Sequence, residues 1–382
     1  MRGRELPAGR LKILLWHWGR RGAGPRYTLE LARALMRQQD TDVYLSVSSD
    51  SELIDAFRAL KIPTLEIKTY TGFFSALFTT LNIFSTRRKL FNFIIDNKIN
   101  VVDSTMSHLW SRFVTGVVQR AGVVMLNTVH DAVLHPGEDG GFKSWFYQPF
   151  KNADGYIALT QYVGQQLSDV HGIPPEKVTV IPLGPLSGPV VHAHVTGGAA
   201  GPLRLLFFGR ILRYKGLARL IEAYAIVRAE GLPVSLQITG AGDMRDVMAA
   251  VQALPDITVS NVWVPEDKMG TVFSQADLIV LPYLESSQSG VIASAFAAGV
   301  PAIGTPIGGL PEQITHGVNG LVAANTSPAA LASEIRRLAR DRDLLETLKA
   351  GALETAQQQF SWDKISSDVM ALSHACLRAI PF

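Results

Sequence analysis

The stretch Arg204-Leu-Leu-Phe-Phe-Gly209-Arg210-Ile-Leu-Arg-Tyr-Lys215-Gly216 predicts the architecture of the second half of this 382-residue chain. Its apolar run stops at Gly209, and two cations, Arg210 and Lys215, precede a helical pattern that begins at Leu217. Such a run predicts a strand buried on both faces, followed by a sharp turn at glycine. Ligands of open parallel sheets bind beyond the carboxyl ends of the strands. The stretch therefore predicts a phosphate-binding loop, against the alternative that both cations are solvated surface charges.

Length and composition indicate a globular protein of two domains. A chain of 382 residues, 47% hydrophobic and 18% charged, exceeds what one hydrophobic core usually serves. The net charge of +3 does not indicate nucleic acid as a partner. The single cysteine, Cys376, excludes an internal disulfide framework and a cysteine metal cluster, which favours a reducing, cytoplasmic location.

Strand patterns alternate with helical patterns along the chain. The expected strands are residues 11–16, 43–47, 64–67, 101–102, 123–128, 156–159, 177–181, 203–208, 234–239, 257–259, 278–281, 302–304 and 320–322. Such alternation predicts parallel sheets with right-handed crossovers. We therefore expect an α/β protein with doubly wound, Rossmann-like domains at 1–185 and 202–360, joined by a linker at 186–201 that is rich in glycine and proline.

A glycine loop follows the first expected strand, where Gly22 and Gly24 precede a helix that starts near Pro25. Glycines let a ligand approach the backbone closely, although a flexible turn accounts for the same residues. The dinucleotide-binding spacing GxGxxG is absent, and so is a ribose-binding acid after the strand. The loop therefore argues against an NAD-dependent oxidoreductase.

Residues 70–98 combine aromatic and basic side chains, with phenylalanines on both sides of Arg87-Arg88-Lys89. Aromatic residues beside a basic cluster are typical of a helix at an anionic lipid surface. A buried crossover helix with a basic exposed end explains the same residues. Because no apolar run is long enough to span a bilayer, we expect any membrane contact to be peripheral, at the inner face of the cytoplasmic membrane.

Three stretches of the second half resemble, in order, the retaining glycosyltransferases of the GT-B fold in the large glycosyltransferase family 4. They are the stretches from Phe208 to Gly216, from Leu236 to Asp243 and from Ala276 to Glu312. The resemblance implies two Rossmann-like domains that face an interdomain cleft, with the nucleotide-sugar bound by the second domain. It also implies that the C-terminal segment 361–382 crosses back to complete the first, acceptor-side domain.

The resemblance assigns a role to the cations of the opening stretch. In that family a glycine-arginine and lysine-glycine signature binds the diphosphate of the donor, which implies this role for Arg210 and Lys215, with Gly209 and Gly240 at the turns. A nucleoside diphosphate gains charge as the glycosidic bond breaks, and fixed cations stabilise that charge without a metal. Glycines of the first domain, Gly22 among them, are expected to meet the same donor.

The loop before residue 290 departs from the family pattern. Many members carry two glutamates eight positions apart, and the aligned positions here are Ser286 and Ser294. The loop Ser287-Gln288-Ser289-Gly290-Val291 resembles that of one branch of the family, and its last three residues lead into a helix whose amides favour phosphate. We expect Glu285 to contact the sugar and Ser294 to hydrogen-bond the ribose.

The pair His130-Asp131 follows another expected strand. A histidine at such a place is more often structural than catalytic, but the resemblance implies that it faces the reacting sugar. We expect His130 to position the sugar, and Asp131, His135 and Glu138 to lie on the acceptor side. These side chains also suggest a metal site, yet strand-end loops seldom bring such groups together and the family needs no ion.

The hypothesis from the sequence is a retaining, metal-independent glycosyltransferase that moves a sugar from a nucleoside diphosphate donor to a glycan or lipid-linked acceptor. Its expected setting is the synthesis of cell-surface polysaccharide or glycolipid, without a cofactor. Because both glutamates are replaced, the alternative is a nucleotide-sugar-binding protein without transferase activity. The base, the sugar, the acceptor and the oligomeric state do not follow from the sequence.

Overall fold

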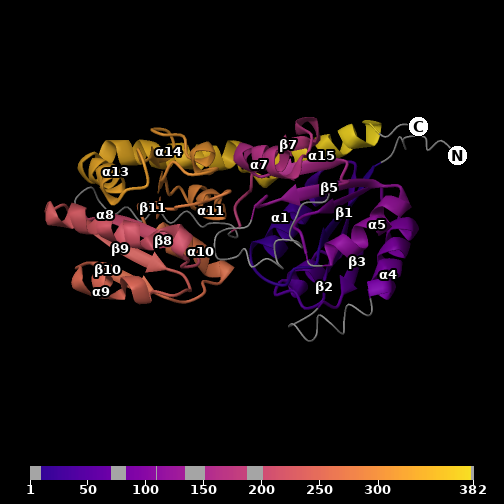
Figure 1. Ribbon diagram of the computed structural model, residues 1–382, viewed down its shortest axis with the longest axis horizontal. Helices are drawn as coiled ribbons and strands as arrows, with labels where there is room; N and C mark the ends of the chain where they lie inside the picture. The colour runs from indigo at the N-terminus through magenta and orange to yellow at the C-terminus, as the bar shows by residue number, and fades with distance from the viewer. Residues whose placement is uncertain (1–9, 70–82, 109, 134–150, 187–200, 380–382) are drawn as a thin grey trace. The chain divides into compact units, whose positions relative to one another are not determined.

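The computed structural model describes residues 10–69, 83–108, 110–133, 151–186 and 201–379. Contacts divide the chain into two compact units, one made of Met1–Leu183 with Trp362–Phe382 and the other of Gly184–Ser361 (Figure 1). His135, Glu138, residues 70–82 and most of the expected linker lie outside the described residues.

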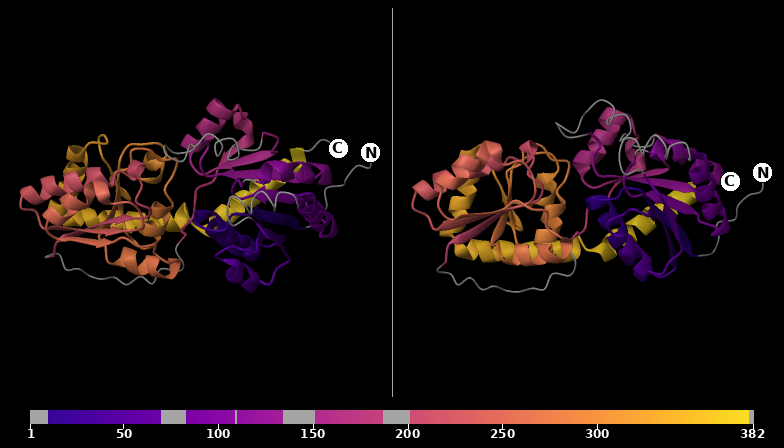
Figure 2. Two further views of the ribbon diagram at one scale, coloured as in Figure 1. Left: turned by 60° about the horizontal axis from the view of Figure 1, so that its bottom comes forward. Right: turned by 90° about the horizontal axis from the view of Figure 1, so that it is seen from below.

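The first unit is built on a parallel sheet with the strand order β3-β2-β1-β4-β5-β6-β7. Its strands are β1 (Leu11–His17), β2 (Thr41–Ser48), β3 (Thr64–Ile67), β4 (Val101–Ser104), β5 (Val124–Val129), β6 (Gly155–Ala158) and β7 (Val178–Val180). The helices used below are α1 (Ala23–Arg37), α4 (Ile83–Asp96), α5 (Ser111–Ala121), α7 (Gln161–His171) and α15 (Trp362–Ala379). Helices cover both faces of the sheet (Figure 2), which explains why β1 and β5 are apolar and buried almost throughout.

The second unit repeats this plan with the strand order β10-β9-β8-β11-β12-β13. Its strands are β8 (Leu203–Phe208), β9 (Val234–Thr239), β10 (Ile257–Ser260), β11 (Leu278–Leu281), β12 (Ala302–Gly304) and β13 (Gly320–Val322). Its helices include α8 (Leu217–Ala229), α9 (Arg245–Ala253), α11 (Gly290–Ala297), α12 (Leu310–Gln313), α13 (Pro328–Arg340) and α14 (Arg342–Gln358). Separate hydrophobic clusters lie on the two faces, one against α8, α9 and α13 and the other against α11, and α14 contributes to both. The doubly wound sheets expected from the sequence are therefore present in both units.

Both sheets have one point where the strand order reverses. In the first unit β1 pairs in parallel with β2 on one side and β4 on the other. In the second unit β8 pairs in the same way with β9 and β11. Ligands of such sheets bind outside the carboxyl ends of the strands at this switch point. The loops after β1, β4, β8 and β11 are therefore placed for binding.

The C-terminal helix α15 belongs to the first unit and packs against α1, as the resemblance implied. Arg37 of α1 forms an ion pair with Asp363 at 2.6 Å. Gln38 donates a hydrogen bond to the Ser366 hydroxyl at 2.9 Å. These contacts close one face of the first unit with the last segment of the chain.

Helix α4 supports the crossover interpretation of the described part of 70–98. Ile83, Leu90 and Ile94 are buried on one side of the helix, as expected for a helix that covers a sheet. Phe84, in contrast, is 75% exposed and Ile95 is 42% exposed. The packing therefore accounts for one face of α4 and leaves a mixed apolar and basic face in solvent.

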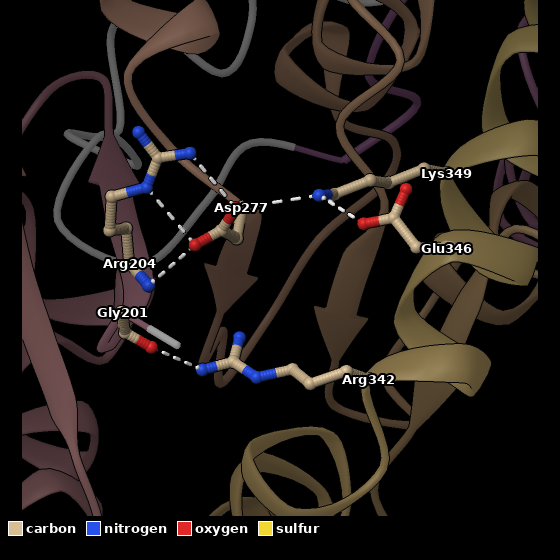
Figure 3. A network of polar contacts seen from close by, with 6 residues as sticks. All are labelled: Gly201, Arg204, Asp277, Arg342, Glu346 and Lys349. Carbon is tan, nitrogen blue, oxygen red and sulfur yellow. Dashed lines mark hydrogen bonds and ion pairs between the residues drawn. The ribbon is translucent and has the colours of Figure 1, made fainter. Parts of the chain in front are cut away.

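A charge network holds β8 and β11 together at their amino ends (Figure 3). Asp277, directly before β11, accepts hydrogen bonds from the backbone and the guanidinium of Arg204 at 2.9–3.1 Å. Lys349 of α14 lies 3.4 Å from the same carboxylate and 2.8 Å from Glu346. Burial raises the pKa of Asp277, but the Arg204 hydrogen bonds outweigh it and hold that pKa below its usual value. The network fixes the two strands whose opposite ends carry the switch point.

Candidate functional site

Glycine contacts shape the loop that follows β8. A Cβ on Gly240 would stand 1.9 Å from the carbonyl oxygen of Gly209, and one on Gly216 would stand 1.9 Å from the carbonyl oxygen of Pro282. Gly216 has a φ of +69°, which disfavours any other residue. The loops after β8, β9 and β11 therefore touch backbone to backbone, and only glycine permits these contacts.

Lys215 points back toward Gly209. Its Nζ lies 3.2 Å from the place where a Cβ on Gly209 would stand, and Val291 of α11 borders the same place at 3.8 Å. The Tyr283 hydroxyl accepts a hydrogen bond from Nζ at 3.3 Å, and Nζ lies 5.0 Å from the centre of that ring. The fold thus brings together three predicted residues, Gly209, Lys215 and Val291. Tyr283 was not predicted.

Arg210 and Glu285 flank this centre with different exposure. The Arg210 side chain is exposed, whereas Glu285 is half-buried in the loop after β11. The backbone amide of Leu284 donates a hydrogen bond to Tyr214 O at 2.7 Å, which ties the Glu285 loop to the β8 loop. Both side chains therefore come from loops that meet at the switch point, and their predicted contacts with a donor stay predictions.

The start of α11 is fixed by Gln313, a residue that the sequence did not single out. The Gln313 side chain accepts a hydrogen bond from Ser289 N at 2.8 Å and donates one to Ser289 O at 3.2 Å. The Ser289 amide is therefore already used, so the phosphate contact predicted for this loop falls to Gly290 and Val291. These two amides lie in the first turn of the helix and have no intrahelical acceptor.

The serines at the two glutamate positions lie inside the second unit. Ser294 is fully buried, and its hydroxyl accepts a hydrogen bond from Leu186 N at 3.0 Å. Ser286 is 3% exposed and its hydroxyl donates to Gln288 O at 3.1 Å. Both hydroxyls thus have partners within the protein, and the ribose contact expected of Ser294 stays a prediction.

The glycine loop of the first unit leads into α1 at Ala23. Gly22 has a φ of +88°, and its amide donates a hydrogen bond to the Glu52 carboxylate at 2.8 Å. A Cβ on Gly24 would stand 2.5 Å from Cε1 of His17 and 2.8 Å from the sulfur of Met106. Gly24 therefore packs against His17 at the end of β1 and against Met106 in the loop after β4, at the switch point of this sheet.

His130 lies at the end of β5 and is 6% exposed. Its Nε2 is 3.0 Å from Thr105 O, and because a carbonyl only accepts, Nε2 carries the proton and Nδ1 does not. The Tyr27 ring meets the imidazole edge-on, with 5.1 Å between ring centres. Burial lowers the pKa of His130, although Asp131 opposes this shift. The structure therefore presents a neutral, oriented imidazole beside the half-buried Asp131.

Two further buried histidines, His17 and His108, were missed by sequence reasoning. Burial lowers the pKa of His17 to about 3, with smaller contributions from His108 and His130. Burial also lowers the pKa of His108 to about 3, with help from Arg20. His108 Nδ1 accepts a hydrogen bond from Trp110 N at 3.2 Å. The carboxyl edge of this sheet thus carries neutral imidazoles. The sequence did hold a signal for this cluster, because His17 and His130 each stand at the end of an apolar strand.

The described residues include neither a candidate metal site nor a helix that could span a membrane. No group of three or more histidine, cysteine, aspartate or glutamate side chains is arranged there to hold a metal ion. None of the helices in that part of the chain is both long and apolar enough to cross a bilayer.

Comparisons with known families match both units. Residues 202–341 match the family model described as glycosyl transferases group 1, and residues 24–184 match the model described as glycosyltransferase family 4. Each unit of the chain is therefore similar to glycosyltransferases of these families. The first match includes the Gly209–Lys215 loop, and the second includes the His130 loop.

Individual relatives agree with the family. This chain is 26% identical to WcaL of Salmonella typhimurium, assigned to colanic acid biosynthesis, over 59% of the chain and 58% of that protein. It is 27% identical to a D-inositol 3-phosphate glycosyltransferase of an Arthrobacter species, over 72% of this chain and 71% of the relative. The matches span 43–58% of the length of the first three curated relatives.

Solved structures share the whole fold. A glycosyltransferase of Rickettsia africae has a TM-score of 0.76 at 16% identity and covers 97% of this chain and 99% of its own. Anabaena HepE in complex with UDP has a TM-score of 0.72 at 16% identity and covers 96% of this chain and 100% of its own. The fold of this chain is therefore shared with solved glycosyltransferases.

Proposed function

We propose that the protein transfers a sugar from a nucleoside diphosphate donor to an acceptor hydroxyl. The observation that carries the proposal is the convergence of Lys215 Nζ, Gly209 and the start of α11 at the switch point of the second unit. A cation, a turn without side chains and free helix amides suit a diphosphate. The HepE neighbours were solved with UDP and UDP-glucose, which supports this class of donor.

Charge stabilisation of the leaving group is the main catalytic step that these residues support. As the glycosidic bond breaks, the diphosphate takes up negative charge, and Arg210 and Lys215 are placed in the loop to neutralise it. The acceptor hydroxyl attacks the anomeric carbon, its proton passes to the leaving diphosphate, and the sugar-phosphate oxygen departs with the bonding electrons. Front-side attack of this kind retains the anomeric configuration. Retention and independence of metal are parts of the proposal.

A neutral His130 suits contact with the sugar. An imidazole with Nε2 protonated and Nδ1 unprotonated offers an uncharged hydrogen-bond acceptor, which fits a sugar hydroxyl better than a phosphate. We propose that His130 positions the transferred sugar and that Asp131 lies on the acceptor side. The acceptor class is a glycan or lipid-linked alcohol of cell-surface polysaccharide synthesis, as the WcaL relative suggests.

A second candidate function is nucleotide-sugar binding without transfer. Ser286 and Ser294 stand where many relatives have glutamates, and both hydroxyls are engaged within the unit. A buried serine that already accepts the Leu186 amide contributes little to ribose binding. This candidate predicts donor binding without transfer or hydrolysis.

A screen of UDP-, GDP- and ADP-sugars separates the candidates. Binding to the folded state raises the unfolding temperature, with about 2.7 kcal/mol of stabilisation expected when ligand is at 100 times its dissociation constant. The transferase proposal expects one donor class to stabilise the protein and to be turned over with an acceptor or, slowly, with water. Stabilisation without any turnover across acceptors supports the binding protein, and no stabilisation by any donor contradicts both.

We also propose peripheral contact with an anionic lipid surface through α4, in a cytoplasmic protein. Phe84, Arg88 and Ile95 recur at helical spacing and lie exposed on one side of the helix. Phe113 on the neighbouring helix α5 is 41% exposed. Exposed aromatics with a basic cluster are what an interfacial helix requires.

Vesicle binding tests the lipid contact. The protein is expected to sediment with phosphatidylglycerol vesicles at low salt and to release from them at high salt, because screening weakens the attraction. Phe84→Ser and Arg88→Glu should each reduce binding, whereas Arg219→Glu, an exposed change on α8, should leave it nearly unaltered. Absence of binding at low salt would remove this part of the proposal.

A further inference from the structure

Ser289 occupies the N-cap position of α11 without capping it. Its side chain makes no capping hydrogen bond, although serine at this position usually accepts one from the second or third helical amide. Ser289 is 4% exposed, so its backbone needs partners inside the protein. The first backbone amides of α11 therefore receive no capping hydrogen bond from the Ser289 side chain.

Gln313 supplies those partners from α12. The side-chain amide of Gln313, itself 5% exposed, forms two hydrogen bonds with Ser289, one to N at 2.8 Å and one to O at 3.2 Å. Two contacts between one planar amide and one backbone residue fix both the position and the orientation of that residue. The carbonyl of Gln313 is in turn 3.4 Å from the Asn319 side-chain nitrogen, which donates to it.

The segment held by Gln313 borders the cationic centre. Val291 lies two residues after Ser289, and its Cγ2 borders the Gly209 position next to Lys215 Nζ. Orienting Ser289 thereby sets the direction of the Gly290 and Val291 amides. Helix amides are worth most to an anion when they are fixed before the ligand arrives.

We propose that Gln313 is a positioning residue for the donor diphosphate, acting through Ser289 on the amides at the start of α11. The inference rests on the proposed function and deepens it. It assigns to Gln313 a task in phosphate recognition in a chain where Ser286 and Ser294 stand at the glutamate positions.

The test compares UDP with uridine on Gln313→Met and Gln313→Glu. Methionine removes both hydrogen bonds, whereas glutamate keeps an acceptor for Ser289 N and loses the donor to Ser289 O. We expect Gln313→Met to weaken UDP binding about tenfold, since charge-assisted contacts are lost, and to leave uridine binding within about twofold. Gln313→Glu also sets a carboxylate oxygen against Ser289 O and adds a negative charge near the diphosphate, so it should weaken UDP binding at least as much as Gln313→Met.

Thr355→Val is the matched control. Thr355 is 6% exposed, and its hydroxyl donates to Gly351 O at 2.7 Å and accepts from Asn319 at 3.1 Å, but it does not touch Ser289. Its loss should lower the unfolding temperature without changing the ratio of UDP to uridine affinity. Thermal unfolding of each variant confirms that it is folded at the assay temperature.

The outcomes separate the two proposals. If Gln313→Met loses UDP and uridine affinity equally, or loses neither, the positioning role of Gln313 is overturned. The proposed donor site is not contradicted by that result. If the wild type binds none of UDP, GDP and ADP, the proposed function fails first. If GDP or ADP binds in place of UDP, the same comparison is made with guanosine or adenosine.

Discussion

The two switch points share one topology and carry opposite chemistry. In the second unit the loop after β8 presents Arg210 and Lys215, which suit phosphate. In the first unit the corresponding edge presents His17, His108 and His130, whose pKa values are all lowered by burial. The sheet fixes where loops emerge, and the residues after each strand decide whether the ligand group is charged or neutral.

The loops also differ in what their glycines touch. In the second unit, a Cβ built on Gly216 or Gly240 would stand 1.9 Å from a backbone carbonyl oxygen. A backbone atom of this kind cannot move aside as a flexible side chain can. Gly24 of the first unit instead approaches the side chains of His17 and Met106. We infer that the loop after β8 is rigid, whereas the start of α1 is held by side-chain contacts.

The largest expected effect comes from removing the cations. Arg210→Ala or Lys215→Ala should each lower kcat by about 10²–10³-fold, because a fixed contact to the leaving group is lost. Arg219→Ala, an exposed change on the next helix, should stay near wild type. Steady-state turnover of the donor found in the screen measures this, and near wild-type rates in both cation variants would remove the contrast between the switch points.

The second expected effect comes from adding a Cβ to the rigid loop. Gly216→Ala and Gly231→Ala both place alanine at positive φ, +69° and +75°, which costs about 1–2 kcal/mol. Only at Gly216 does the Cβ also meet a backbone carbonyl, whereas nothing lies within 4 Å at Gly231. Gly216→Ala should therefore lower the free energy of unfolding by a further ~1–3 kcal/mol. Urea unfolding measures the difference, and equal losses would show that the loop is not rigid.

The third prediction uses the pKa values of the first unit. Burial lowers the pKa of His17 to about 3 from 6.5 and raises the pKa of Asp103 to about 7 from 3.8. The histidine contributes stability above pH 6.5 that is lost as pH falls, whereas the aspartic acid contributes stability below pH 3.8 that is lost as pH rises through about 7. Between these limits the two effects oppose each other.

Two variants separate these slopes. Relative to wild type, Asp103→Asn should make the free energy of unfolding rise more steeply with pH, by about 1.4 kcal/mol per pH unit between about pH 4.5 and 6. His17→Asn should flatten the same curve by a similar amount. Urea unfolding across this range is the measurement, and unchanged slopes would mean that these groups are not buried in their uncharged forms.

The smallest expected effect concerns Tyr283. Tyr283→Phe removes the hydroxyl that accepts from Lys215 Nζ at 3.3 Å and keeps the ring beneath the ammonium. One such hydrogen bond is worth about 1 kcal/mol, so kcat should fall about fivefold with little change in stability. Turnover and thermal unfolding of the same sample measure both. A loss as large as that of Lys215→Ala would instead give the tyrosine a direct part in the reaction.

Much of the fold was predictable because its signals are local. The strand at 203–208 was expected at those residues, since an apolar run bounded by polar residues determines a buried strand. Gly209 and Lys215 were also expected in one loop after that strand, and the structure places Lys215 Nζ next to Gly209. Helix α1 was expected near Pro25 and begins two residues earlier, at Ala23, so that Gly24 lies within the helix.

The remaining site residues depend on contacts between distant parts of the chain. Tyr283 lies 68 positions from Lys215, and Gln313 lies 24 positions from Ser289. No local pattern marks either residue, because their roles arise only when β8 and β11 pair and α12 packs beside α11. Likewise, the surroundings of His17 include Gly24 of α1 and Met106 of the loop after β4. The cleft expected between the domains stays a prediction.

A crystal structure of the protein with UDP tests the central claim most directly. The account predicts diphosphate oxygens within hydrogen-bonding distance of Lys215 Nζ, the Arg210 guanidinium and the Gly290 and Val291 amides. It also predicts that Ser289 keeps its two hydrogen bonds to Gln313. A diphosphate bound at the histidine edge of the first unit, or bound away from Arg210 and Lys215, would contradict the division of chemistry between the two switch points.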